Sequence, residues 1–357
     1  MTDETPWPEP RKNPELIGHE AAECAFADSL RSGRLPHAWL MCGPEGIGKA
    51  TLAFRFARFL LAGGTAPGLF GADNLDMDAE HPVFRRVAAG GHADLMTVEI
   101  SPDPKTGKMR TEIVVDDVRS VNEFLHMTPA EGGYRVVVVD AVDRMNRNAA
   151  NALLKILEEP PSQAVLLLVC HAPGRVVATI RSRCRKLVLR PLADAEVGQL
   201  LSRFLPELED RDRAALVKLA EGSPGRALAL AQAGGLELYR EMVDVIAAAG
   251  SPGAALQKFC ERSARAEEGF RTVTQLFLWW LARAIRLSAR GGDFAGDEIV
   301  AGEGAALARV ARAGGLDRFV ELWEKAGRLF ARAESVNLDR KQVVMSAFVA
   351  LENAAAP

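Results

Sequence analysis

The chain has 357 residues, of which 48% are hydrophobic and 25% are charged, and its formal net charge is −3. This length favours two or three domains over a single core. The near-neutral charge excludes a protein that coats nucleic acid with a uniformly basic surface, although it leaves local basic patches open.

The cysteines, the start of the chain and the apolar stretches all favour a cytoplasmic protein over a secreted or membrane protein. The five cysteines are odd in number and widely spaced, which is typical of reduced, buried thiols and not of a disulfide framework. The polar, proline-rich start of the chain lacks the basic-then-apolar order of a secretory signal. The apolar stretch over residues 273–282 is shorter than the roughly 20 residues that a membrane span needs. We therefore expect a soluble, cytoplasmic protein without a membrane partner.

Short β-rich runs alternate with amphipathic helical stretches from about residue 13 to residue 190. Continuous apolar strands separated by helices predict an α/β fold with a parallel sheet flanked by helices. A helix is expected over 50–61, and the glycine- and proline-rich region 63–94, which has no periodicity, is interpreted as an insertion or surface excursion. The expected strands cover 39–42, 135–139, 165–170 and 186–189.

Strand signals stop after Pro191 and helical periodicity takes over. A small helical set is expected over about 193–233, and the glycine pair at 234–235 is a plausible break before a longer helical part. The sequence thus predicts an α/β domain over 1–190, a small helical lid over 191–234 and an all-α domain over 235–357.

A glycine-rich loop follows the first expected strand and precedes the first long helix. Gly43, Gly46 and Gly48 allow backbone N–H groups to turn toward phosphates, and Lys49 adds a positive charge at the start of the helix. We interpret the segment as a nucleotide-binding phosphate loop; the alternative is an ordinary glycine-rich turn.

Two groups needed for hydrolysis are missing from this loop and its partner strand. Hydrolytic loops place Ser or Thr after the lysine to bind Mg²⁺, but Ala50 stands here, and Thr51 is turned about 100° around the helix. Asp140 ends an apolar strand where a metal-binding aspartate belongs, but Ala141 replaces the glutamate that orients the attacking water in related ATPases. We expect weak nucleotide binding, no bound metal and no hydrolysis.

Six basic residues fall between Arg175 and Arg190. Such a run is typical of a solvated basic edge. The alternative is that one arginine inserts into a phosphate site on another molecule, because guanidinium is permanently charged and forks onto phosphate oxygens.

Several motifs occur together in a fixed order. They are Leu35-Pro-His-Ala, Gly43–Lys49, Asn151-Ala-Leu-Leu-Lys-Ile-Leu-Glu-Glu-Pro-Pro161, Ser182-Arg-Cys184 and Gly222-Ser-Pro-Gly-Arg226. In combination they resemble bacterial clamp-loader subunits of the AAA+ class, most closely the delta-prime family of DNA polymerase III, over roughly residues 15–230.

The resemblance implies an AAA+ phosphate-loop sheet, a lid and a C-terminal oligomerisation domain. It further implies a hetero-pentamer with hydrolysing gamma/tau-type and delta-type subunits, which loads a sliding clamp onto primer–template DNA as part of a DNA-directed DNA polymerase holoenzyme. Arg183 matches the family's arginine finger for a neighbour's ATP. Arg226 matches the position called sensor 2, although it is otherwise an ordinary helix arginine. Because Lys49 and Asp140 are kept, weak ATP or ADP binding stays open.

The chain departs from the family in one further respect. Related subunits often carry four cysteines that bind zinc, but no cysteine lies between Cys42 and Cys170. His81 and His92 cannot make a tetrahedral site without other ligands, although Asp76, Asp78 or Asp94 could add oxygen donors. We therefore expect no zinc.

Two other functions are weighed against this one. The first is a catalytically active AAA+ ATPase, either a hydrolysing loader subunit or a branch-migration motor. Such an enzyme needs Ser or Thr after Lys49 and an acidic residue after Asp140, and this chain has neither. A small-molecule kinase or other phosphate-loop enzyme leaves the Leu-Glu-Glu-Pro-Pro string, the Ser-Arg-Cys triplet and the long helical C-terminal part unexplained.

Overall fold

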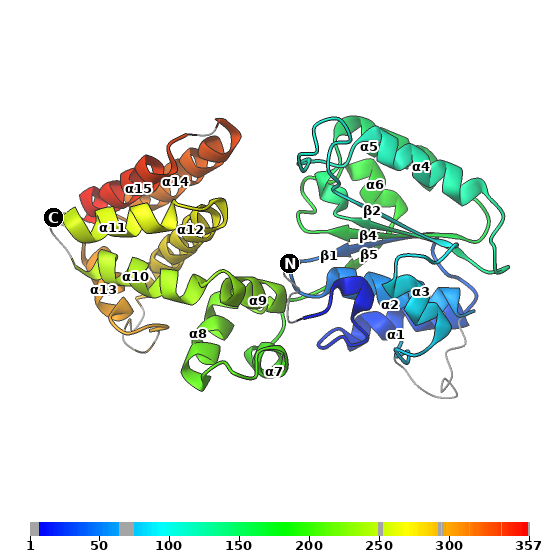
Figure 1. The fold of residues 1–357 in the computed structure, drawn as a ribbon, viewed down its shortest axis with the longest axis horizontal. Coiled ribbons are helices and arrows are strands. Elements are labelled where there is room, and N and C mark those ends of the chain that lie inside the picture. Colours follow the sequence, from blue (N-terminus) through cyan, green and yellow to red (C-terminus); the bar gives the residue numbers. More distant parts are fainter. Residues whose placement is uncertain are drawn as a thin grey trace. The chain divides into compact units, whose positions relative to one another are not determined.

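A computed structural model describes most of the chain (Figure 1). The described residues are 7–63, 75–248, 253–291, 294, 296, 298–313, 315–336 and 338–355. The chain divides into two compact units, Met1–Pro206 with Glu221–Gly225, and Glu207–Ala220 with Arg226–Pro357. The finer division into three domains at 190 and 234 stays a prediction.

The first unit contains a five-stranded sheet in the order β2-β3-β4-β1-β5. All paired strands run parallel. The strands are β1 (Ala38–Cys42), β2 (Leu95–Glu99), β3 (Arg135–Asp140), β4 (Ala164–Cys170) and β5 (Arg185–Val188). The predicted α/β fold with a parallel sheet is confirmed, and four of the five strands lie where the sequence placed them; only β2 was not predicted.

Helices cover both faces of this sheet, with α1, α2 and α3 on one face and α4, α5 and α6 on the other (Figure 1). Because β1, β3 and β4 are central and buried on both sides, they are almost purely apolar. The helices and short 3-10 turns of this unit are η1 (Pro10–Lys12), α1 (Glu20–Arg31), α2 (Lys49–Leu61), α3 (Pro82–Ala88), α4 (Val115–His126), η2 (Val142–Arg144), α5 (Arg147–Glu158), α6 (Ala178–Arg183) and α7 (Asp194–Phe204).

Part of the region 63–94, which the sequence predicted to be an insertion or surface excursion, is the helix α3 packed against α2. This helix buries Val83, Phe84 and Val87. The Arg58 guanidinium of α2 lies 4.5 Å from the centre of the Phe84 ring, and Arg55 pairs with Asp76 at 2.6 Å. These contacts join the segment to α2, whereas residues 64–74 lie outside the described residues.

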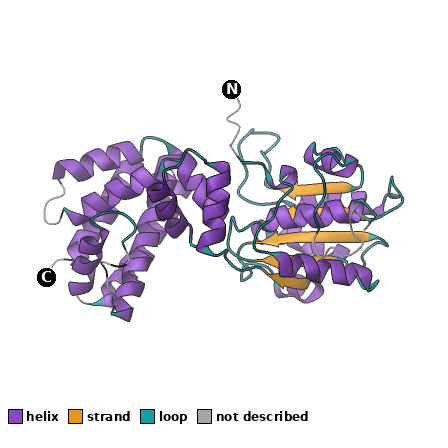
Figure 2. Ribbon diagram, turned by 90° about the horizontal axis from the view of Figure 1, so that it is seen from below, coloured by secondary structure: helices purple, strands orange, loops and turns teal. Residues whose placement is uncertain are grey.

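The second unit is helical, as Figure 2 shows by the absence of strands from its described part. Its helices are α8 (Asp210–Ala220), most of α9 (Pro224–Gln232), α10 (Gly235–Ala247), α11 (Gly253–Ser263), α12 (Glu267–Arg290), α13 (Glu303–Arg312), α14 (Leu316–Val336) and α15 (Arg340–Ala355). Phe277 lies at the centre of the packing, with its ring 6.0 Å from that of Phe330 and 5.1 Å from that of Phe348. The expected change from mixed to helical structure after Pro191 is confirmed.

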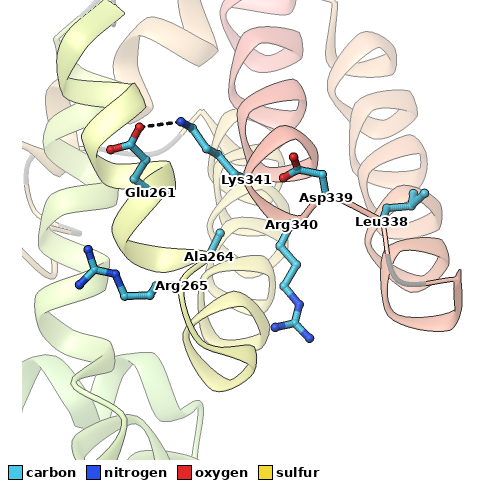
Figure 3. Close-up of a pocket in the computed structure, with 7 residues that line it drawn as sticks. All are labelled: Glu261, Ala264, Arg265, Leu338, Asp339, Arg340 and Lys341. Carbon is cyan, nitrogen blue, oxygen red and sulfur yellow. Dashed lines mark hydrogen bonds and ion pairs between the residues drawn. The ribbon is translucent and has the colours of Figure 1, made fainter.

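An open, charged hollow lies between α11 and the start of α15 (Figure 3). Its charges are partly paired within the unit: Lys341 bonds to Glu261 at 2.6 Å, and Arg340 bonds to Glu267 of α12 at 3.3 Å. The Lys341–Glu261 pair joins α15 to α11 at the hollow, and the Arg340–Glu267 pair joins α15 to α12.

No helix among the described residues is both long enough and apolar enough to cross a membrane.

Candidate functional site

The glycine-rich loop joins the carboxyl end of β1 to the start of α2, which is the position that a phosphate loop requires. Gly46 and Gly48 have φ angles of 77° and 100°, which side chains rarely adopt. At Gly43 an added Cβ would lie 2.6 Å from the carbonyl oxygen of Leu189. All three predicted glycines are therefore required by the backbone itself.

Lys49 is the first residue of α2 and is only 2% exposed. Its Nζ donates a hydrogen bond to the carbonyl oxygen of Gly43 at 2.8 Å and another to that of Pro44. Burial lowers the pKa of Lys49, while the carboxylates of Asp140 and Glu45 act in the opposite direction. The lysine thus lies inside the loop, with its ammonium group held by loop carbonyls.

The next two residues complete the first turn of α2. Ala50 has no oxygen to offer a metal. Thr51 is buried, with 8% of its surface exposed. The position after the lysine therefore lacks the Mg²⁺ ligand, as predicted from the sequence, although the glycine conformations and the buried Lys49 of the loop are kept.

Asp140 ends β3, and its carboxylate lies near charged groups of neighbouring strands. Burial raises its pKa, opposed by His171 and by Lys49, and Glu99 raises it further. Nε2 of His171 is 3.7 Å from Oδ1 of Asp140. Glu99 ends β2 and is the register partner of Asp140, so two carboxylates meet at this edge of the sheet.

His171 is a member of this site that the sequence reasoning missed. It directly follows β4, the strand next to β3, and parallel strands bring their carboxyl ends to one edge. A polar residue immediately after a buried strand was the available signal. Burial, followed by the charge of Lys49, lowers the pKa of His171, while the carboxylate of Asp140 acts in the opposite direction.

Asp143 has a structural task at this edge. Its carboxylate accepts hydrogen bonds from the backbone N–H groups of His171 at 2.8 Å and Ala172 at 3.2 Å. Ala141, at the position of the missing glutamate, is only 6% exposed. The two hydrogen bonds of Asp143 hold the end of β4 in place. Asp143 therefore does not take the place of the glutamate that would activate water.

Two segments distant in sequence hold the loop from outside. The His19 imidazole lies 2.6 Å from the carbonyl oxygen of Ile47. The hydroxyl of Ser223 donates to the carbonyl oxygen of Glu45 at 2.8 Å, and the N–H of Gly225 donates to that of Gly46 at 2.9 Å. The Gly-Ser-Pro-Gly part of the fifth motif therefore packs directly against the phosphate loop.

The two predicted arginines lie in different surroundings. Arg226, in the helical unit, places its guanidinium carbon 5.7 Å from the centre of the Trp279 ring, and Arg283 lies 5.8 Å from the same ring. Arg183 ends α6, and its Nη2 forms a 2.8 Å ion pair with Oε1 of Glu158. Gly43, Gly46, Gly48 and Lys49 lie in one loop, and the charge of Asp140 acts on Lys49. The nucleotide-binding role of these residues, of Thr51 and of Arg226 stays a prediction.

Among the described residues, no group of three or more His, Cys, Asp or Glu side chains is arranged to hold a metal ion. Cys42 and Cys170 are register partners at the ends of β1 and β4, and both are buried free thiols.

Comparisons with known proteins bear on the same residues. A family model described as DNA polymerase III, delta subunit, matches residues 18–193. The delta' subunit of DNA polymerase III from Pseudomonas aeruginosa is 39% identical over 189 residues, 53% of this chain and 53% of the relative. The tau/gamma subunit from Haemophilus influenzae is 30% identical over 62% of this chain and 30% of its own length. The match thus spans about half the length of the delta' relative. A solved gamma subunit-related protein of DNA polymerase III from Thermotoga maritima superimposes with a TM-score of 0.43 and 18% identity over 93% of this chain and 100% of its own.

Proposed function

We propose that this chain, which belongs through residues 18–193 to the family described as DNA polymerase III, delta subunit, works as a delta-prime-type subunit of a clamp loader. In this role it takes part in ATP-driven loading of a sliding clamp onto primed DNA without hydrolysing ATP itself. The tau/gamma relative belongs to the same polymerase, which supports a complex of several related subunits.

One observation carries the proposal: the phosphate loop is built to completion, yet two catalytic groups are absent from it. Gly46 and Gly48 keep the positive φ angles of such a loop, and Lys49 is buried at the start of the helix that follows it. Ala50 supplies no metal ligand, and Ala141 supplies no base for water. Because phosphoryl transfer depends on positioning and charge stabilisation, losing both groups leaves a bound nucleotide intact. Weak ATP or ADP binding is part of this proposal.

The hydrolytic chemistry in this account belongs to a neighbouring subunit. Arg183 stands at the end of α6 with its side chain 35% exposed, within reach of another molecule. An arginine supplied in trans stabilises the charge that develops on the transferred phosphoryl group. Arg183 is therefore proposed as the finger for a neighbour's ATP.

The proposed partners are gamma/tau-type and delta-type subunits in a hetero-pentamer, with the clamp and primer–template DNA bound through the whole complex in the cytoplasm. A groove between α4 and α5 is lined by donors suited to DNA phosphates, among them Arg119, Asn122, Asn151 and Lys155. The net charge of −3 favours weak DNA affinity for the chain alone.

Reconstitution with the other loader subunits of the same organism tests the function. Clamp loading on primed DNA should require this chain and should survive Lys49→Met, which keeps the buried stem but removes the charge at the loop. Loading that proceeds without the chain, or that Lys49→Met abolishes, contradicts the proposal.

A further inference from the structure

We infer that Glu158 is a positioning residue for Arg183 and holds its guanidinium in the orientation from which it engages a neighbour's nucleotide. This inference rests on the proposed function of Arg183 as a finger, and it assigns a task to one of the two acidic residues in the Leu-Glu-Glu-Pro-Pro string.

The guanidinium of Arg183 is held at both of its terminal nitrogens. Nη2 pairs with Oε1 of Glu158 at 2.8 Å, while Nη1 donates to the carbonyl oxygen of Thr179 at 3.1 Å. Thr179 belongs to α6, the helix of Arg183 itself, whereas Glu158 is the last residue of α5. Because the two anchors come from different helices, they fix the plane of the guanidinium and not only its distance from the backbone.

The apolar core sets the relative position of these two anchors. Ile180 of α6 and both Leu153 and Leu157 of α5 are at most 2% exposed and belong to one buried cluster against the sheet. The frame of the ion pair is thus rigid, and only the two long side chains have freedom. A carboxylate at a helix C-terminus is unfavourable beside the terminal carbonyls, and the Arg183 cation offsets this cost.

The exposure of the pair makes it exchangeable. The side chains of Arg183 and Glu158 are 35% and 50% exposed, and ion pairs in such surroundings are weak. A guanidinium has five N–H donors, so Arg183 can turn further donors to a phosphate while Glu158 still orients it. The carboxylate therefore prepares the finger without competing strongly with a nucleotide.

The adjacent Glu159 provides a matched control. It has the same charge and is also exposed, and its backbone N–H donates a hydrogen bond to the carbonyl oxygen of Lys155. Replacing Glu159 thus changes the net charge of the motif equally but leaves the orientation of Arg183 intact.

A double-mutant cycle on ATP hydrolysis by the reconstituted loader tests the inference. Glu158→Gln should lower kcat by about two- to fivefold with KM unchanged, since a weak surface pair carries the orientation. Glu158→Asp should keep part of the rate, and Glu159→Gln all of it. In an Arg183→Ala background, Glu158→Gln should have no further effect.

Two results would overturn the inference: an equal loss for Glu158→Gln with and without Arg183, or full activity of Glu158→Gln. Melting temperatures of the single variants check that the fold is kept. Full activity of Arg183→Ala alone would instead contradict the finger assignment itself, so failure of the inference and failure of the proposed function are distinguishable.

Discussion

The side-chain nitrogen of Lys49 lies 2.8 Å from the carbonyl oxygen of Gly43, to which it donates a hydrogen bond. The residue that contacts nucleotide phosphates in active loops is thus engaged by its own loop. A nucleotide has to replace this bond, and without a hydroxyl after the lysine it gains no compensating metal contact. We therefore predict that any nucleotide binding at this loop is weak and does not depend on a metal ion.

Restoring the missing metal ligand should reverse that property. Ala50→Ser places a hydroxyl directly after Lys49, where Mg²⁺ is held in hydrolytic loops, so nucleotide affinity should become dependent on magnesium. Calorimetric titration of ADP with magnesium or with a chelator measures the difference. An equal magnesium dependence of the natural chain and of Ala50→Ser would show that Ala50 is not the limiting position.

Asp140 gives a pH-dependent prediction. Burial raises the pKa of Asp140 in the folded state, so the folded protein holds the neutral acid more easily than the carboxylate. The stability that this gives is fully present below the pKa of Asp140 in the unfolded chain and is lost as pH rises through its pKa in the folded protein. Asp140→Asn removes the buried charge, so the variant should melt at a higher temperature than the natural chain at pH 7. The gain should shrink as pH falls toward 4. A variant less stable than the natural chain at neutral pH would contradict this reading of the site.

Arg226 gives a prediction about the helical unit. Its guanidinium carbon lies 5.7 Å from the Trp279 ring centre, so Arg226→Gln should reduce the free energy of unfolding by about 0.5–2 kcal/mol. Arg312→Gln, at an exposed position near the end of α13, should change it by less than about 0.5 kcal/mol. Chemical denaturation measures the free energy of unfolding of both variants. Equal losses would show that the contact between Arg226 and Trp279 does not stabilise the helical unit.

Glu303 is buried, with 0% exposure, and accepts hydrogen bonds from Tyr239, Arg283 and the backbone N–H of Ile299. Glu303→Ala removes the buried carboxylate that Tyr239, Arg283 and the Ile299 N–H share as an acceptor, and it should cost about 3–5 kcal/mol of unfolding free energy. Glu303→Gln keeps an acceptor and should cost less. Denaturant unfolding followed by circular dichroism measures both, and equal losses would show that packing, not charge, decides stability here.

The sequence predicted the central strands because β1, β3 and β4 are buried on both faces and read as continuous apolar runs. It missed β2, whose residues Leu95–Glu99 lie at the sheet edge and are mostly half-buried, so no clear pattern marks them. It also missed α3, because His81-Pro82 within a glycine-rich region reads as a loop. This short helix is stabilised by its packing against α2, which the local sequence does not reveal.

The candidate site was predictable where it is local in sequence. The glycines, Lys49 and Asp140 are recognised from loop chemistry and from strand ends. The position of His171 beside Asp140 depends on the order of the strands in the sheet, and the pairing of Arg183 with Glu158 depends on the contact between α5 and α6. Neither can be predicted from residue spacing in the sequence. The same holds for Arg226, whose aromatic neighbour lies more than fifty residues away in the chain.

ATP hydrolysis by the isolated chain and by the reconstituted loader carrying Arg183→Ala tests the central claim most directly. We predict no turnover by the chain alone, with or without primed DNA. The complex with Arg183→Ala should turn over severalfold more slowly, because a finger in trans contributes orders of magnitude at the one site it serves while the other hydrolysing subunits of the proposed complex stay active. Robust hydrolysis by the isolated chain, or full activity of the Arg183→Ala complex, would contradict the account.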